Sequence, residues 1–375
     1  MTRAGTEWDA ALDYLPPRPR RLDWGIGCVG AGFIMRDCHL VAYANAGFRV
    51  VGIAGSPSGR GRAEEVARLR GVPRVYDSVA QMLADPAIEI LDVAVPPHAL
   101  AGVIREITAA PRRPKGVLAQ KPLGMNYAEA GEIVERCERA GVTLAVNQSM
   151  RYDQSVRAMR SLLRRGDLGE PVLATIEMRA IPHWMPWQRG YGWLTLRIMS
   201  IHHLDCFRFW FGDPQRIYCS ARTDPRTAFP HTDGICLYVL EYAGGLRCSA
   251  WDDVWTGPAL EGAAPDIGIR WRVEGAAGLA EGTIGWPSYP ERAPSTLRFT
   301  TTRHSGRWVE PRWTKAWFPD AFEGTMAQLL IALESGSEPE IGGRDNLKTM
   351  ALVDAAYRSA AEHRAVAIEE VLTCS

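Results

Sequence analysis

Short apolar runs alternate with segments of helical spacing between Trp24 and Gln148, and this alternation constrains the fold more than any other feature. The two kinds of segment follow one another as apolar runs 24–30, 48–55, 89–97, 115–120 and 142–148 and helical segments 33–47, 61–71, 98–110 and 126–141. Strands that alternate with helices build βαβ units, in which a parallel sheet has helices on both faces. The sequence therefore predicts an N-terminal α/β domain with a doubly wound parallel sheet.

The pattern changes beyond Gly166 to strands joined by short glycine turns. We expect strands within 171–180, 216–223, 235–253, 268–283 and 295–302 and helices at 151–165, 201–211, 320–335 and 344–363. Gly244 and Gly245 mark the tip of a hairpin. This mixture predicts an α+β domain built on an open, mostly antiparallel sheet. At 375 residues two domains are expected, and we set the limits at 1–22 for an N-terminal arm, 23–148 for the α/β domain and 149–375 for the second.

The composition excludes several classes of protein. Lys+Arg and Asp+Glu each total 43, so no global field favours nucleic acid or a membrane. No segment reaches the roughly 18 apolar residues that span a bilayer, and the N-terminus lacks the apolar core of a secretion signal. Eight scattered cysteines without a CxxC pair predict reduced thiols in a cytoplasmic protein and no metal site.

The stretch GIGCVGAGFIM joins the first predicted strand to the first helix. Gly30, Gly32 and Met35 occupy the spacing of G-x-G-x-x-G, with the third glycine absent. A pyrophosphate rests on such a turn because the backbone is bare and the helix N-terminus is electropositive. We expect a Rossmann-type nucleotide site whose loop comprises Gly30, Ala31, Gly32, Phe33 and Ile34. The alternative is a strand–helix turn that binds no nucleotide.

The position of the ribose-binding acid, about 20 residues further on, falls in VGIAGSPSGRGRAE. Gly55 and Ser56 stand there, with Arg60 and Arg62 downstream. A missing carboxylate removes repulsion against a 2′-phosphate, and Ser56 with Arg60 can bind one. The sequence therefore favours NADP, with NAD as the alternative; the arginines also suit an ordinary solvated helix start.

The strand in LAQKPLG ends on a charged amine, Lys121, which is followed by Pro122. Ligands gather at the carboxyl ends of the strands in parallel sheets. We therefore expect Gln120 and Lys121 to lie beside a cofactor. A solvated surface lysine is the plain alternative.

Six pieces of the chain, in their order and spacing, resemble the glucose-fructose oxidoreductase / inositol dehydrogenase (Gfo/Idh/MocA) family. They are GIGCVGAGFI, DVAVPPHAL, LAQKPLG, AVNQSMRYDQ, IHHLDCFRFWFG and DAFEGTMAQLL, and the likeness covers roughly residues 23–370. The resemblance implies a Rossmann domain and an α/β domain whose open sheet mediates oligomers, hence a homodimer or homotetramer. It also implies oxidation or reduction of a carbon–oxygen centre on a sugar or cyclitol.

Two motifs place residues beside the cofactor through this resemblance. VPPHAL resembles the family loop after the fourth strand, which puts Pro96, Pro97 and His98 alongside the cofactor. QKP resembles the family's E-K-P, which makes Lys121 the active-site lysine and replaces the glutamate by Gln120.

IHHLD resembles the family's D-x-G-x-H-x-x-D and aligns His202 with its histidine and Asp205 with its trailing acid. The leading Asp falls on Ile198 and the Gly on Ser200. Histidine titrates near neutrality, so His202 is a natural base or acid for a hydroxyl proton, with Lys121 as hydrogen-bond donor and proton relay. The alternative is that both His202 and its neighbour are satisfied core histidines.

The loop IPHWMPWQRGYGW gathers aromatic residues that can stack on a sugar ring. Core packing is the alternative for each of them. The residues expected to contact substrate are His183, Trp184, Trp187, His203 and Asp320.

These patterns together predict an NAD(P)-dependent oxidoreductase that acts on a secondary alcohol or ketone of a sugar, sugar derivative or cyclitol. One alternative is nicotinamide-dependent cleavage of a glycosidic or C–O bond through transient oxidation. Another is a non-catalytic sensor that binds a sugar or nucleotide.

Overall fold

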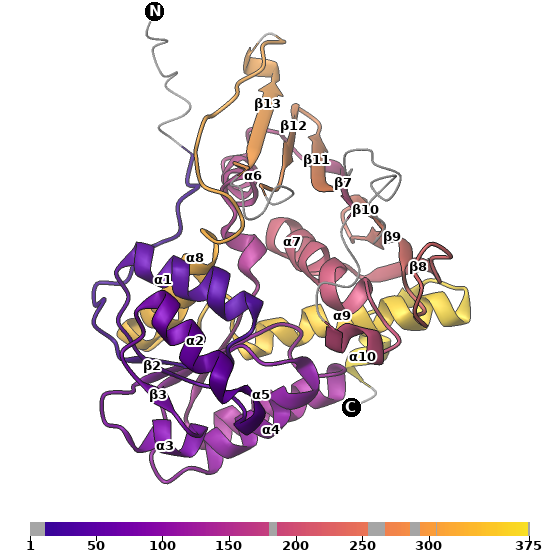
Figure 1. The fold of residues 1–375 in the computed structure, drawn as a ribbon. Helices are drawn as coiled ribbons and strands as arrows, with labels where there is room; N and C mark the ends of the chain where they lie inside the picture. Colours follow the sequence, from indigo (N-terminus) through magenta and orange to yellow (C-terminus); the bar gives the residue numbers. More distant parts are fainter. Residues whose placement is uncertain (1–11, 180–185, 254–266, 286–292, 305, 374–375) are drawn as a thin grey trace, which may run out of the picture. The chain divides into compact units, whose positions relative to one another are not determined.

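The computed structural model describes residues 12–179, 186–253, 267–285, 293–304 and 306–373 (Figure 1). Its contacts divide the chain into two compact units. Pro16–Ser149 and Pro319–Met350 form the first, here called the Rossmann unit. The remaining described residues form the second, here called the sheet unit.

The Rossmann unit contains a six-stranded sheet in the order β3-β2-β1-β4-β5-β6. Every neighbouring pair is parallel. The strands are β1 Ile26–Val29, β2 Val50–Ala54, β3 Val75–Tyr76, β4 Ile90–Val93, β5 Gly116–Ala119 and β6 Thr143–Val146. The predicted doubly wound sheet is confirmed. Its strand order reverses between β1 and β4, which is where ligands bind in such sheets.

The helices of this unit connect the strands, and α8 comes from far along the sequence. They are α1 Leu40–Ala46, α2 Arg60–Arg70, α3 Val79–Ala84, α4 Pro97–Ala109, α5 Tyr127–Ala140 and α8 Phe322–Ser335. α8 packs on β5, β6 and α1, and Leu329 reaches so close to Gly116 that a Cβ there would lie 2.9 Å away. The sequence pattern groups 320–335 with the second domain, but these contacts group it with the Rossmann unit.

The sheet unit is built on eight strands in the order β13-β12-β11-β7-β10-β9-β8-β14. Neighbours are antiparallel except for the parallel pair β7–β10. The strands are β7 Pro171–Arg179, β8 Arg216–Arg222, β9 Ile235–Glu241, β10 Arg247–Asp253, β11 Gly268–Gly275, β12 Gly278–Thr283, β13 Thr296–Thr301 and β14 Val366–Ala367. The predicted mostly antiparallel sheet is confirmed. So is the β9–β10 hairpin, whose tip holds Gly245 at a φ of 89°.

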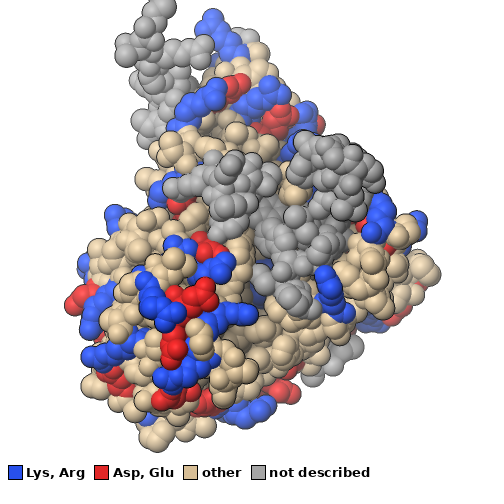
Figure 2. All heavy atoms as spheres, in the orientation of Figure 1, with Lys and Arg blue, Asp and Glu red and all other residues tan. Residues whose placement is uncertain are grey.

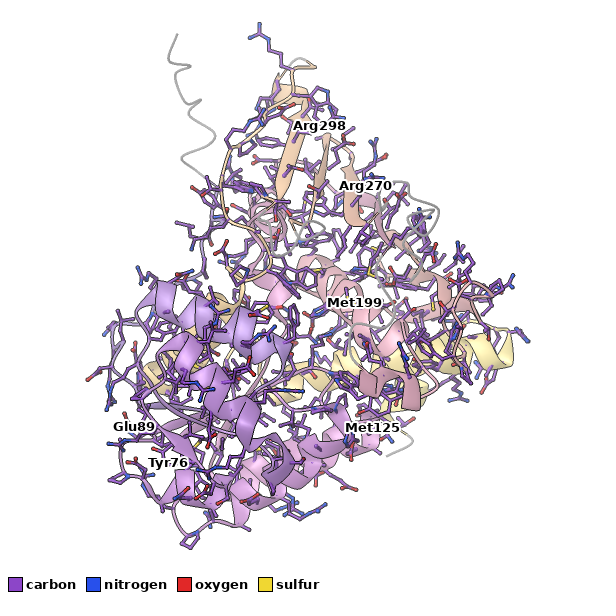
Figure 3. All side chains as sticks on the ribbon, in the orientation of Figure 1. Tyr76, Glu89, Met125, Met199, Arg270 and Arg298 are labelled. Atoms are coloured by element: carbon purple, nitrogen blue, oxygen red, sulfur yellow. The ribbon has the colours of Figure 1, made fainter. Side chains whose placement is uncertain are left out.

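Helices cover one face of this sheet, and no helix of the described residues covers the other, here called the open face. α6 Gln154–Arg164 contacts β12, β13 and α7 Ile201–Phe211. The remaining helices are α9 Gly343–Glu362 and α10 Glu369–Leu372, with short helical turns at Pro57–Gly59, Ser149–Tyr152, Pro186–Gly190, Leu196–Ser200 and Thr302–His304. Met199, in the π-helical turn Leu196–Ser200, is labelled in Figure 3.

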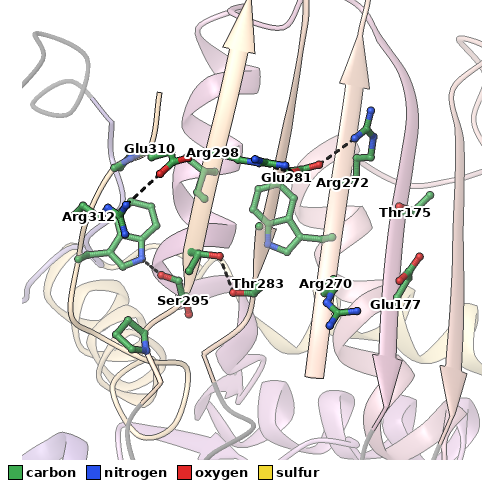
Figure 4. A pocket seen from close by; sticks show the side chains of 17 residues that line it. Thr175, Glu177, Arg270, Arg272, Glu281, Thr283, Ser295, Arg298, Glu310 and Arg312 are labelled. Atoms are coloured by element: carbon green, nitrogen blue, oxygen red, sulfur yellow. Dashed lines mark hydrogen bonds and ion pairs between the residues drawn. The ribbon is translucent and has the colours of Figure 1, made fainter. Parts of the chain in front are cut away.

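The open face carries a shallow hollow over β7, β11, β12 and β13 (Figure 4). Its volume is about 680 Å³, and Arg272 and Arg298 both pair with Glu281 across it. None of the described residues that were predicted to bind cofactor or substrate lines it. Towards β8 and β9 the same face becomes apolar, with Tyr218 46% exposed and Leu237 53% exposed.

The described part of the N-terminal arm is bound at several points. The backbone N–H groups of Arg20 and Arg21 donate to the carboxylate of Glu334. The Arg21 side chain also pairs over 2.6 Å with Glu89, which is labelled in Figure 3. Residues 16–22 are therefore attached to the chain's own Rossmann unit.

The surface and the cysteines agree with the composition. On the face drawn in Figure 2, basic and acidic side chains are interspersed over the visible part of the Rossmann unit. The seven described cysteines are buried free thiols. No helix of the described chain is long and apolar enough to cross a membrane.

Candidate active site

The glycine turn after β1 contains two glycines with different roles. Gly30 has a φ of 100°, and a Cβ on it would lie 2.3 Å from the carbonyl oxygen of Ala94. Its N–H donates to the carbonyl of Ala54 over 2.8 Å. A Cβ on Gly32 would meet no described atom within 4 Å. The fold therefore requires Gly30, whereas Gly32 leaves bare backbone that a pyrophosphate can approach.

Met35 replaces the third glycine of the fingerprint and opens a π-helical turn, Met35–His39, that leads into α1. That glycine normally lets helix and strand pack closely, so the fully buried Met35 side chain needs room. A π turn is wider than an α-helical turn, and such turns occur often at functional sites. The other loop residues are buried at Ala31 and half-buried at Phe33 and Ile34. The turn retains what a dinucleotide needs, so these residues fit NAD(P).

The segment after β2 carries no acid. Ser56 is exposed, and its hydroxyl accepts from the N–H of Gly59 over 3.1 Å. Arg60 begins α2, is exposed and pairs with Glu64 and Asp77. A neutral hydroxyl and a cation therefore occupy the place of the ribose-binding carboxylate.

The loop after β4 begins α4 with two prolines. Pro96 caps the helix and Pro97 is its first residue, a position where the missing N–H carries no cost. Pro97 is buried, Pro96 is half-buried and His98 is exposed in the first turn. The predicted cofactor residues 96–98 thus lie at the carboxyl end of β4.

Lys121 follows β5 by two residues and is half-buried. Its N–H donates to the side-chain carbonyl of Gln120 over 2.9 Å, and its peptide bond to Pro122 is cis. Loss of solvation by burial lowers the pKa of Lys121 from 10.5 to about 7. A substantial fraction of this amine is therefore neutral at neutral pH.

The histidine pair lies in the first turn of α7, in the sheet unit. His202 is 3% exposed, and its ring meets Trp317 edge-on at 5.1 Å between centroids. His203 is fully buried, and its Nδ1 lies 2.9 Å from Oδ1 of the equally buried Asp252. The Ser200 hydroxyl donates to the same carboxylate. A fully buried His203 against an acid is typical of a structural histidine.

Two further positions of the histidine motif are also buried. Ile198, at the place of the motif's leading Asp, is 8% exposed. Asp205, at the trailing acid, accepts from both Nε and an Nη of Arg151 over 2.5 and 2.7 Å. This pair is buried, so Asp205 ties α7 to the turn before α6.

The remaining substrate candidates are spread over both units. Trp187 lies 5.3 Å from Tyr191, and Tyr191 stacks on Trp193 at 4.6 Å between ring centroids. Asp320 is buried just before α8. His183 and Trp184 lie outside the described residues.

A set of buried polar side chains lies behind the glycine turn, and no motif in the sequence predicted it. Asp92, in β4, is fully buried and lies 2.6 Å from Nδ1 of His39, which in turn contacts Asn147. The one sequence sign was an acid inside the apolar run EILDVAV. Among the described residues, no group of His, Cys, Asp or Glu side chains is arranged to hold a metal ion.

Two family models match the chain in series. One, described as an oxidoreductase family with an NAD-binding Rossmann fold, matches residues 24–148, and the GFO/IDH/MocA C-terminal domain matches residues 156–281. The chain belongs to the Gfo/Idh/MocA oxidoreductase family. As a member of that family, it is an NAD(P)-dependent oxidoreductase.

Two of the following three similar proteins match nearly the whole of this chain, and the third matches about three fifths of it. D-apiose dehydrogenase of Paraburkholderia graminis is 26% identical over 92% of this chain and 89% of its own length. Trans-1,2-dihydrobenzene-1,2-diol dehydrogenase of Mus musculus is 31% identical over 61% of this chain and 67% of its own. Levoglucosan dehydrogenase, solved with NADH and levoglucosan, has the same fold, with a TM-score of 0.77 at 17% identity over 92% of this chain and 99% of that one.

Proposed function

We propose that this oxidoreductase transfers hydride between NADP and a secondary alcohol, or the matching ketone, on a sugar, sugar derivative or cyclitol. The observation that supports this most is Lys121, a half-buried amine just past the carboxyl end of β5 whose pKa burial lowers to about 7. Catalytic acids and bases work best when their pKa lies near the operating pH.

In the oxidation direction, the alcohol carbon gives up its hydrogen with both electrons, and the hydroxyl gives up a proton, which leaves a ketone. A bound NADP⁺ would supply the acceptor for the hydride and would thereby become NADPH. The protein's task is to take the proton. We propose that His202 accepts it as the base and that Lys121 hydrogen-bonds the substrate oxygen and relays the proton to water. In reduction the same groups return the proton.

The other site residues have roles in this proposal that follow from their motifs. The loop of residues 30–34 holds the pyrophosphate through bare backbone at Gly32, and residues 96–98 with Gln120 line the nicotinamide side. On the substrate side we propose the aromatic loop that includes Trp187, together with Asp320.

The proposed preference for NADP rests on the end of β2. A 2′-phosphate carries negative charge, and no acid opposes it between residues 50 and 63. The Ser56 hydroxyl would supply a hydrogen bond, and the Arg60 guanidinium, which pairs with Glu64 and Asp77, would exchange one of these acids for the phosphate.

The proposed substrate class is supported by the names of the relatives. D-apiose dehydrogenase and 1,5-anhydro-D-fructose reductase, the latter 26% identical over 92% of this chain, are named for sugars or sugar derivatives. The dihydrobenzene-diol dehydrogenases are named for a cyclic diol. Each of these names refers to a hydroxylated ring or to a small sugar.

The test is a panel of aldoses, anhydrosugars, sugar acids and inositols with NADP⁺ or NAD⁺, followed through absorbance of the reduced nicotinamide. We expect reduction with one ring class and faster turnover with NADP⁺. Substrate loss without any change in nicotinamide absorbance would instead support cleavage through transient oxidation. Absence of nucleotide binding would refute the proposal.

A further inference from the structure

Three buried side chains of the Rossmann unit meet behind the glycine turn. Asp92 is the acid in the middle of the sheet, on β4, and is completely buried. Its Oδ2 accepts from the hydroxyl of Tyr43 over 2.7 Å and lies 2.6 Å from Nδ1 of His39. Tyr43 and His39 are both fully buried as well. A buried carboxylate needs hydrogen-bond donors. Both groups meet its Oδ2, whereas Oδ1 has no hydrogen-bond partner among the described residues.

The same histidine connects this acid to the segment that carries the lysine. Nε2 of His39 lies 3.0 Å from Nδ2 of Asn147, which follows β6 and is 1% exposed. Nδ2 of Asn147 also donates to Oε1 of Gln120 over 3.3 Å. Oε1 of Gln120 accepts a second bond, from the N–H of Lys121 over 2.9 Å. Side chains from three different parts of the unit thus converge on the turn after β5.

Donors and acceptors match along this chain in one arrangement. The carboxylate of Asp92 can only accept, so Nδ1 of His39 carries the proton and donates to it. In a neutral His39, Nε2 is then an acceptor, which suits a donor from Asn147. The amide nitrogen of Asn147 has two hydrogens, one for His39 and one for Gln120. With the amide reversed, the oxygen of Asn147 would face the oxygen of Gln120, and two acceptors repel.

The backbone already fixes where the strands end. The N–H of Gln120 donates to the carbonyl of Val93, and the N–H of Asn147 donates to the carbonyl of Ala119. These backbone hydrogen bonds do not determine the direction of the Gln120 side chain. Because that side chain receives the N–H of Lys121, its direction sets the start of the lysine turn.

We propose that His39 and Asn147 are positioning residues that, through Gln120, hold the Lys121 turn in its partly buried place. The inference rests on the role proposed above for Lys121 and extends it to side chains that touch neither substrate nor cofactor. It also gives a reason for Gln120 where the family motif has an acid. The amide oxygen accepts both bonds, as a carboxylate would, without adding a negative charge beside the amine.

The experiment measures the lysine itself, independently of turnover. Lysine occurs in the chain at positions 115, 121, 315 and 348, so competitive acetylation with acetic anhydride, read by peptide mass spectrometry, resolves each one. In the wild type we expect the reactivity of Lys121 to titrate near pH 7. In Asn147→Leu the turn is released and the amine reaches water, so the midpoint rises by at least about one pH unit towards 10.5.

Asn346→Leu is the matched control. Asn346 is 1% exposed in the same unit, and its side-chain amide has no hydrogen-bond partner among the described residues. We expect its Lys121 midpoint to equal that of the wild type. Lys115, which is exposed, serves as an internal reference in every sample. Gln120→Met is a second variant at a half-buried position, where loss of the fold is not expected, and it should reproduce the effect of Asn147→Leu.

The outcomes separate the two proposals. A raised midpoint in both Asn147→Leu and Gln120→Met, together with a fall in kcat of about 10- to 100-fold at unchanged nucleotide affinity in Asn147→Leu, supports the positioning role. Folded Asn147→Leu and Gln120→Met variants that titrate like the wild type would overturn it. Failure of the proposed substrate class would appear as absent turnover in the wild type and would leave the titration test intact.

Discussion

Burial of a lysine amine is favourable for proton transfer and unfavourable for stability. In the unfolded chain Lys121 titrates near 10.4, whereas in the folded protein burial lowers its pKa to about 7. Below about pH 10 the Lys121 amine is protonated in the unfolded chain. Folding must therefore either release that proton or bury the positive charge of the amine. The group destabilises the fold most below pH 7, and the penalty disappears as the pH rises from 7 towards 10.5.

Replacing Lys121 with methionine removes this penalty. We predict that Lys121→Met increases the free energy of unfolding by on the order of 2 kcal/mol at pH 7, after allowance for the partial exposure of the residue. The gain should shrink to nearly zero at pH 10.5. Urea denaturation of both proteins at pH 7 and pH 10 measures this difference. A variant less stable than the wild type at pH 7 would contradict it.

The proposed preference for NADP can be tested at a single residue, Ser56. If Ser56 lies beside the ribose as proposed, the carboxylate of Ser56→Asp would repel a 2′-phosphate and accept from a 2′-hydroxyl. We predict that the ratio of the Kd for NADPH to that for NADH rises by at least about tenfold, since each 1.4 kcal/mol changes an affinity tenfold. Ser337→Asp, the same change at another exposed serine of the unit, should leave the ratio unaltered.

At the scale of elements, hydrophobic periodicity predicted most of the strands and helices. The five strand runs of the first half correspond to β1, β2, β4, β5 and β6, and the hairpin glycines lie where expected. The two-residue strand β3 and the six-residue helix α3 were missed because segments so short show little periodicity. Periodicity also identified the helix at 320–335 but not the sheet on which it packs, since that depends on tertiary contacts.

The site was predictable only in part, for the same reason. Lys121 stood out because a charged residue ended an apolar run, and Gly30 because a sharp turn needs it. The π turn at Met35 and the bonds that join Asp92 to Asn147 depend on residues that are distant in sequence. A single sequence carries no direct sign of such pairs.

Substitutions at the two glycines of the turn should affect the stability of the fold and the affinity for NADPH separately. We predict that Gly32→Ala keeps the melting temperature of the wild type, because its Cβ enters open space, but weakens NADPH binding at least about tenfold by blocking the pyrophosphate. Gly30→Ala should lower the melting temperature as well, because its Cβ meets Ala94. Isothermal titration and thermal unfolding report the two effects. Gly131→Ala in α5, another open position, is the control, and a Gly32→Ala variant with unchanged affinity would contradict the assigned loop.

At the scale of the whole molecule, the open face of the sheet unit leaves apolar side chains in water. Tyr218, Leu237 and Val239 are adjacent on β8 and β9 and are 46%, 53% and 37% exposed. Exposed apolar patches on a sheet mark interaction surfaces. We propose that this face joins copies of the chain into a dimer or tetramer.

Sedimentation velocity tests that proposal. We predict that the wild type sediments as a multiple of its 41.4 kDa chain and that Leu237→Arg shifts it to single chains, because a charge would be buried in the contact. Leu69→Arg, the same change at a leucine that is 59% exposed in the Rossmann unit, should not. A wild type that sediments as a single chain would refute the assembly.

The proposed part of Lys121 in proton transfer to and from the substrate can be measured through the pH dependence of kcat/KM. With the best substrate of the panel, the oxidation rate of the wild type should rise through a midpoint near pH 7 as the amine loses its proton. In Lys121→Met we expect kcat/KM to fall by about 10²–10⁴-fold and that midpoint to disappear. A variant that retains both the rate and the midpoint would show that the lysine has no part in the reaction.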